Sequence, residues 1–136
     1  MTGEILYLDS SALLKLVVVE RESTELITFV AQWDHHAVSA LAVTEVLSAA
    51  QRRAAAEVDE VRSRAETVLT GVALIRVDEA LLRMAAKLGP PSLCSLDAIH
   101  LASALSLGDD LAGLVTYDNR LAKGAYSSAV PVHMPG

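Results

Sequence analysis

The sequence predicts an α/β fold with a central, mostly parallel sheet of four to five short strands flanked by helices. Short apolar or β-branched runs alternate with longer helical patterns along the chain, which is typical of parallel sheets covered on both faces. Apolar residues make up 52% of the 136 residues, which is enough to bury a core. Because no linker, internal repeat or low-complexity segment interrupts this pattern, we expect one domain over 1–136.

The first half of the chain predicts two strands and four helices. The strands cover 4–8 and 37–39. The helices cover 10–18, 23–33, 41–56 and 58–70. Ser10 or Ser11 is an N-cap residue type at the start of the first helix. His35 and His36 are expected in a solvated turn between the second helix and the second strand.

The second half predicts three more strands and three more helices. The strands cover 73–77, 114–116 and 129–132, and Pro131 favours an edge position for the last one. The helices cover 78–88, 95–107 and 118–123. Asp78 and Ser95 are the expected N-caps, and Gly89 with the two prolines after it ends the helix that Asp78 begins.

Four isolated acids fall where the chain passes from one element to the next: Asp9, Glu45, Asp97 and Asp118. Asp9 and Asp118 lie just past predicted strands, and the other two lie early in predicted helices. Ligands of parallel α/β sheets bind beyond the carboxyl ends of the strands, near a switch in strand order. The topology therefore predicts that the four carboxylates meet at one edge of the sheet.

Asp97 is the most informative of these acids, because the helix that contains it is apolar on nearly every face. A buried carboxylate normally neutralises, pairs with a cation or binds a metal. The acids also have ordinary structural interpretations: Asp9 and Asp118 as helix caps, Asp97 as a partner of the helix dipole, and Glu45 as a surface residue. As a set, they favour a divalent metal site that hydrolyses a phosphate ester.

Composition excludes several other classes of protein. A net charge of −6 argues against a general nucleic-acid-coating protein, and 4% aromatic residues leave no platform for stacking bases. No apolar run reaches the roughly 18 residues of a membrane span, and no secretory signal is visible, so we expect a cytoplasmic protein. Cys94 is the only cysteine and is expected to be a small buried apolar residue. His100 is expected to pack in the core, with a hydrogen bond to a site carboxylate as the alternative.

Four stretches, YLDSSALLKL, SALAVTEVLSA, LDAIHLASAL and TYDNRLA, resemble the motifs of PIN domains, specifically VapC-type toxin ribonucleases, in the family order. The resemblance implies a three-layer PIN-like fold and an RNA-cleaving Mg²⁺ or Mn²⁺ site. Its acids would be Asp9, Glu45, Asp97 and Asp118, with Ser10 and Thr116 in support. We expect Asp9 and Asp97 to be the main ligands. The resemblance also implies a small antitoxin partner and a homodimer.

RNA would then be held by cations close to the site acids. The candidates are Lys15, Arg52, Arg53, Arg120 and Lys123, with Arg62 and Arg64 as a further pair. A solvated charged face is the ordinary interpretation of the arginines around residues 52–64. For the homodimer, the amphipathic helices before residue 70 are the expected interface.

Two other functional classes remain possible at the sequence level. One is a PIN-like module that binds RNA or protein without cleaving it, although the chain has all four acids. The other is a receiver-type phosphoacceptor, which needs an acidic pair after the first strand and a lysine after a late strand. Here Ser10 and Ser11 follow Asp9, and the strand at 129–132 contains no lysine.

Overall fold

A parallel sheet forms the centre of the molecule, as the sequence predicts. The computed structural model describes residues 3–53 and 55–136. In this part of the chain, five strands pair in the order β3-β2-β1-β4-β5, and every pairing is parallel. They are β1 (Ile5–Leu8), β2 (His35–Ser39), β3 (Ala73–Ile75), β4 (Leu111–Val115) and β5 (Val132–His133).

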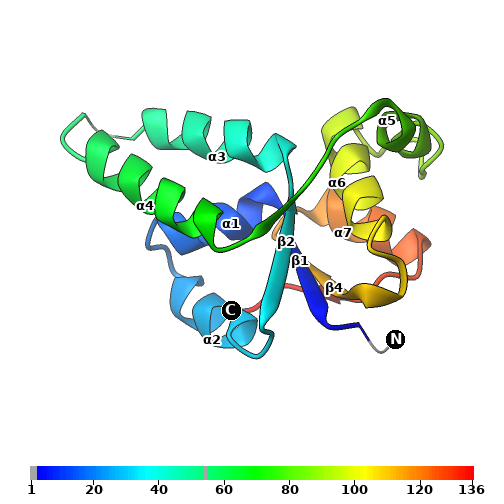
Figure 1. Cartoon of the computed structure of the whole chain (residues 1–136), viewed down its shortest axis with the longest axis horizontal. Helices are drawn as coiled ribbons and strands as arrows, with labels where there is room; N and C mark the ends of the chain where they lie inside the picture. The colour runs from blue at the N-terminus through cyan, green and yellow to red at the C-terminus, as the bar shows by residue number, and fades with distance from the viewer. Residues whose placement is uncertain (1–2, 54) are drawn as a thin grey trace.

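Helices cover both faces of this sheet, which gives three layers. They are α1 (Ser10–Val17), α2 (Ser23–Val30), α3 (Leu41–Gln51), α4 (Val58–Thr70), α5 (Glu79–Ala85), α6 (Ser95–Leu105) and α7 (Asn119–Ser127), with a short 3₁₀ turn at Gly108–Asp110. Figure 1 shows α1 to α4 on one side of the sheet and α5 to α7 on the other. Among the described residues, no helix combines the length and apolar character that crossing a membrane requires.

The alternation of side chains along β1 links the two cores. Leu6 and Leu8 face the core formed with α1 to α4, whereas Tyr7 between them faces the core formed with α6 and α7. All three side chains are at most 1% exposed. The hydroxyl of Tyr7 therefore lies on the α6 side of the sheet, close to the end of β1.

Strand order reverses beside β1. The chain builds β2 and β3 on one side of β1 and then returns to place β4 and β5 on the other side. The carboxyl ends of β1 and β4 thus flank the switch point, where α/β sheets bind their ligands. Asp9 follows β1 directly, and its backbone N–H donates to the Val115 carbonyl at the end of β4 (3.2 Å).

Several predicted boundaries were wrong, and local hydrogen bonding explains most of them. The helices predicted over 23–33, 41–56 and 78–88 end at Val30, Gln51 and Ala85, because the chain then tightens into i→i+3 turns. Part of the predicted helix 41–56 lies outside the described residues. The helix predicted over 118–123 continues to Ser127, with Gly124 allowing close contact: a Cβ there would lie 3.0 Å from Leu93 Cδ1.

Further corrections concern strands and caps. The strand predicted over 73–77 ends at Ile75, and the one predicted over 114–116 covers Leu111–Val115. The last strand begins at Val132 rather than 129, because the Val130 N–H is still bonded to the Ala125 carbonyl, and it is an edge strand as predicted. His35 and His36 belong to β2 rather than to a turn, and His36 Nε2 contacts the Val30 carbonyl (2.7 Å). The N-cap positions of α1 and α6 are Asp9 and Cys94, not the predicted serines, whereas Asp78 caps α5 as predicted.

Candidate functional site

A pocket of about 320 Å³ lies at the switch point between β1 and β4, and all four predicted acids line it. They come from four separate parts of the fold: the end of β1, the second turn of α3, the first turn of α6 and the loop after β4. The lining consists of Asp9, Ser10, Ser11, Glu45, Cys94, Leu96, Asp97, His100, Asp118 and Arg120.

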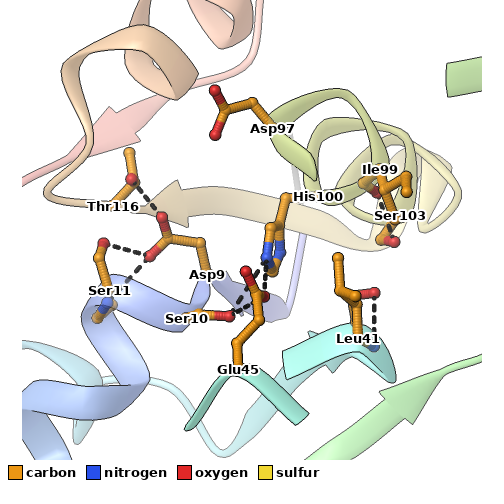
Figure 2. A network of polar contacts seen from close by, with 12 residues as sticks. Asp9, Ser10, Ser11, Leu41, Glu45, Asp97, Ile99, His100, Ser103 and Thr116 are labelled. Atoms are coloured by element: carbon orange, nitrogen blue, oxygen red, sulfur yellow. Dashed lines mark hydrogen bonds and ion pairs between the residues drawn. The ribbon is translucent and has the colours of Figure 1, made fainter. Parts of the chain in front are cut away.

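Asp9 is the most tightly held of the acids (Figure 2). Its Oδ1 accepts from the Ser11 hydroxyl (2.7 Å) and the Ala12 backbone N–H (2.9 Å), while Oδ2 accepts from the Thr116 hydroxyl (2.6 Å). Asp9 is only 4% exposed, and this burial raises the pKa of its carboxyl although the hydrogen bonds lower it. The side chain is therefore fixed in place, and its negative charge is costly unless a cation is present.

Glu45 is held from the other side of the pocket by Ser10 and His100. Its Oε1 accepts a hydrogen bond from the Ser10 hydroxyl and contacts His100 Nε2 (2.8 Å). Burial raises the pKa of Glu45, but the hydrogen bonds with His100 and Ser10 outweigh it, so the pKa lies below its usual value. The surroundings thus lower the pKa of Glu45, whereas burial raises that of Asp9.

Asp97 projects from the first turn of α6 toward the pocket, above Asp9 and Thr116 in Figure 2. It is 8% exposed, and its Oδ2 accepts from the Cys94 thiol (2.9 Å). Cys94 itself is exposed and lines the same pocket, so the prediction of a buried apolar cysteine was wrong. The thiol lies outside the core because Cys94 is the N-cap position, before the buried turns of α6 begin.

Asp118 is less buried and caps α7. Its Oδ1 accepts from the backbone N–H groups of Arg120 (2.8 Å) and Leu121 (3.4 Å). Its own N–H donates to the Thr116 hydroxyl (3.0 Å), the same hydroxyl that donates to Asp9. Asp118 therefore caps a helix, which is the structural role that the sequence suggested for it, and it also lines the pocket.

These donors fit a hard divalent cation held partly through water. Among residues 3–53 and 55–136, no three Asp, Glu, His or Cys side chains converge closely enough to surround a metal ion directly. Mg²⁺ normally retains several waters and takes only one or two carboxylates from the protein. The carboxylate oxygens are suitable ligands for such an ion. The hydrogen bonds from Ser11 and Thr116 to Asp9 are of the kind that orients metal ligands.

The predicted cations do not all lie at the pocket. Arg120 lines it, and Lys123 is exposed one turn further along α7. Lys15 contacts Glu22 (2.6 Å) and Glu20 (3.5 Å), and it lies 4.8 Å above the Tyr117 ring. Arg52 and Arg53 follow the end of α3, about 10 Å along the helix direction from Glu45. Neither belongs to the described lining of the pocket.

Sequence reasoning underestimated the polar residues around the acids. His100 was expected to be a packed core residue; it is buried at 4% exposure, but it also contacts Glu45. The signal was its position three residues after Asp97 on an apolar helix, which places both on one helical face. Ser11, Cys94 and Tyr7 gave no comparable signal, because their partners depend on the tertiary fold.

Comparisons with known proteins bear on the family of this chain. The PIN domain family model matches residues 6–125. Two curated relatives from Mycobacterium tuberculosis align over nearly the whole chain. Ribonuclease VapC46 (strain ATCC 25618 / H37Rv) is 39% identical, covering 96% of this chain and 97% of its own. Ribonuclease VapC47 (strain CDC 1551 / Oshkosh) is 35% identical, covering 97% and 98%.

A solved structure shows the same fold at lower identity. A chain in a toxin–antitoxin complex from Klebsiella pneumoniae superposes with a TM-score of 0.69 and 20% identity, covering 96% of this chain and 98% of that chain.

Proposed function

Because this chain belongs to the PIN-domain family, and within it to the VapC-type ribonucleases, we propose that it is the toxin of a toxin–antitoxin pair. It cuts RNA internally by hydrolysing phosphodiester bonds in the acidic pocket, with Mg²⁺ or Mn²⁺ as cofactor. Family membership contradicts the receiver-type alternative.

The observation that carries this proposal is that Asp9, Glu45, Asp97 and Asp118 line one pocket although they lie in four distant parts of the sequence. Burying Asp9 and Asp97 beside two half-buried carboxylates is unfavourable without a compensating cation. A site for a divalent cation and an RNA phosphate accounts for the unfavourable arrangement, because the cation offsets the charge of both the acids and the phosphate.

Each acid contributes differently in the proposed site. Asp9 and Asp97, the most buried pair, are the main metal ligands. Asp118 and Glu45 hold a second ion or orient the attacking water. The bound ions would supply Lewis acidity and a more acidic water for an in-line displacement. Ser11 and Thr116 hold Asp9 in position, and Ser10 holds Glu45.

RNA is recognised in this proposal through its backbone. Arg120 lies in the pocket lining, where its guanidinium is available to a phosphate next to the cut bond. Lys15 is paired with Glu22 and Glu20, so it contributes less to RNA binding than Arg120 does.

A small antitoxin and a second copy of the chain are the proposed protein partners. The antitoxin is supported by the toxin–antitoxin complex that shares the fold. Expression of the chain alone is expected to inhibit growth, and co-expression of its cognate small protein is expected to restore it. Growth unaffected by the folded, RNA-cleaving protein would contradict the toxin role without contradicting the nuclease.

Cleavage of RNA by the purified, antitoxin-free protein tests the nuclease directly. The protein is incubated with total RNA in Mg²⁺, Mn²⁺ or EDTA, and the new RNA ends are mapped. We expect defined ends with either metal and none with EDTA. Asp97→Asn should lose cleavage but keep its fold, because it removes a charged ligand and preserves the side-chain shape.

The matched control is Asp109→Asn, the same change at an exposed position of the 3₁₀ turn outside the pocket, which should cleave normally. RNA binding without cleavage in any metal would favour the alternative of a catalytically silent binding module. Wild-type turnover by Asp97→Asn in Mg²⁺ would contradict the proposed role of this acid.

A further inference from the structure

His100 has polar contacts at both of its ring nitrogens, which core packing does not require. Nδ1 lies 2.8 Å from the hydroxyl of Tyr7, whereas Nε2 lies 2.8 Å from Oε1 of Glu45 and 3.3 Å from the hydroxyl oxygen of Ser10. Tyr7, His100 and Glu45 come from β1, α6 and α3, so the contacts connect the sheet to the helices on both of its faces. His100 is only 4% exposed, and its ring meets that of Tyr7 edge to face at 71°.

The Tyr7 end of this chain of contacts has a defined direction. The backbone N–H of Ser39 donates to the Tyr7 hydroxyl (3.2 Å), so the phenol oxygen is an acceptor there. A tyrosine phenol carries its proton near neutral pH. That proton is available to His100 Nδ1. A ring that accepts at Nδ1 carries its hydrogen on Nε2 when it is neutral.

The Glu45 end follows from this direction. The Nε2–H group of His100 points at Glu45 Oε1, which also accepts from the Ser10 hydroxyl. Two donors occupy the two lone pairs of Oε1. Oε2 accepts no hydrogen bond from the residues that the structure describes, so it is the oxygen left for a ligand.

We propose that His100 is a positioning residue: Tyr7 holds it as the Nε2–H tautomer, and it fixes Glu45 with Oε2 free for the divalent ion or its water. The inference rests on the proposed function, since it assigns His100 a role in that same site. It replaces the expectation of a histidine that only fills the core. The same relation, a histidine whose hydrogen-bond partner fixes its tautomer, is common around metal sites.

Nitrogen NMR of the metal-free, unaltered protein tests the tautomer without any substitution. We expect a pyridine-type ¹⁵N shift at His100 Nδ1 and a pyrrole-type shift at Nε2. A hydrogen on Nδ1, in either the other tautomer or the imidazolium form, would overturn the proposed direction of the contacts. Because it involves neither metal nor RNA, this measurement judges the histidine even if the proposed nuclease activity fails.

Two substitutions of His100 separate positioning from packing. Gln places an amide N–H near the position of Nε2, whereas Leu fills space without a donor. We expect His100→Leu to weaken Mn²⁺ binding, measured by calorimetry, by about 10–100-fold, the usual effect of losing an outer hydrogen-bond partner of a ligand. His100→Gln should bind Mn²⁺ nearly as well as the unaltered protein. Equal loss in both variants, or normal binding by folded His100→Leu, would overturn the proposal.

A double-mutant cycle shows whether the effect passes through Glu45. In a Glu45→Ala background, His100→Leu and His100→Gln should bind Mn²⁺ equally, because no carboxylate is left to position. A difference that persists would show that His100 acts by another route and would contradict the proposal. The matched control is His36→Leu, which removes a histidine bonded to the Val30 carbonyl and should leave Mn²⁺ binding unchanged. If the unaltered protein binds no Mn²⁺ and cuts no RNA, the proposed function fails, and the NMR result still stands alone.

Discussion

The hydroxyl of Thr116 donates to Oδ2 of Asp9 at 2.6 Å and ties together the two strand ends that flank the pocket. Thr116 follows β4 and Asp9 follows the neighbouring strand β1, and the two residues are 107 positions apart in sequence. The same hydroxyl accepts from the N–H of Asp118 (3.0 Å), so one fully buried group holds two of the four acids. The position of Asp9 therefore depends on the register of β4 as well as on its own helix.

Thr116→Val should weaken both metal binding and stability, because valine keeps the shape of threonine but lacks the hydroxyl. Oδ2 of Asp9 and the N–H of Asp118 would each lose a buried partner, which costs about 1–3 kcal/mol in unfolding free energy. Mn²⁺ affinity should fall about 10-fold or more. Urea unfolding and calorimetry measure the two effects.

Thr28→Val is the matched control for this substitution, since the Thr28 hydroxyl bonds to the Thr24 carbonyl on the exposed side of α2, away from the pocket. It should change neither quantity. A Thr116→Val protein with normal Mn²⁺ affinity would show that Asp9 does not need this hydroxyl to remain in place.

Asp9 should make the metal-free protein less stable as the pH rises. Burial raises the pKa of Asp9 above its ordinary value of 3.8, although hydrogen bonds from Ser11 and Thr116 oppose this. As pH rises past 3.8, the unfolded chain loses this proton first, so the folded state binds more protons and its stability falls. The loss is complete once the pH passes the raised pKa of the folded protein.

Comparison with Asp9→Asn isolates this effect. In EDTA, the unfolding free energy of the unaltered protein minus that of Asp9→Asn should decrease as the pH rises from about 4 and then level off. With saturating Mn²⁺ near neutral pH, the unaltered protein should instead be the more stable of the two, because a bound cation favours the ionised carboxylate. A difference that increases with pH in EDTA would contradict the effect of burial on Asp9.

The layered sheet and the meeting of the acids could be predicted because both follow from periodic features of the chain. Alternating strand and helix patterns predict parallel pairing, and parallel pairing brings strand ends to one edge. Asp9 and Asp118 could be located this way with no knowledge of their contacts. Helix ends were less predictable, since the tightened turns after Val30 and Gln51 keep helix-forming sequence.

The contacts around the acids could not be predicted, because they join residues that are distant in sequence. His100 and Glu45 are 55 positions apart, and Tyr7 and His100 are 93 apart. Their meeting depends on which face of β1 carries Tyr7 and on the rotation of α6 about its axis. A one-residue shift in the register of either element would separate them.

We predict that the protein forms a homodimer and that the interface between the two copies includes α5 and α6. The sequence favoured the helices before residue 70. However, Leu74, Leu82 and Leu96 are 50%, 44% and 49% exposed, on β3, α5 and α6. Leu82 also lines an apolar pocket of about 320 Å³ between α5 and α6. Leu82 therefore extends a surface of mostly apolar residues, and continuous surfaces of this kind mark interfaces.

Sedimentation at tens of micromolar, roughly the range of weak dimers, tests this prediction. Leu82→Glu should give a monomer, because the charge would be buried at the interface. Ile27→Glu, at a 53% exposed position on α2, serves as control and should remain a dimer. If Ile27→Glu is a monomer and Leu82→Glu is a dimer, the interface lies on the helices before residue 70, as the sequence predicted. If the unaltered protein is a monomer, the prediction of a dimer is wrong.

The last prediction concerns the cations that hold RNA. Arg120 lines the pocket, and Lys123 lies three residues along the exposed side of α7, so both can meet the phosphates of one strand. Each neutralised phosphate adds about −0.7 to the slope of log affinity against log salt for a single strand. Arg120→Gln and Lys123→Gln should therefore each weaken RNA binding and flatten this slope by about that amount. Mn²⁺ affinity should stay the same, since the carboxylates remain.

Arg83→Gln is the control: it removes an equal charge that is paired with Glu79 on α5 (2.9 Å), and it should leave the slope unchanged. If Arg120→Gln and Lys123→Gln leave the slope unchanged, other cations bind the RNA phosphates, and Arg52 and Arg53 are the next to test.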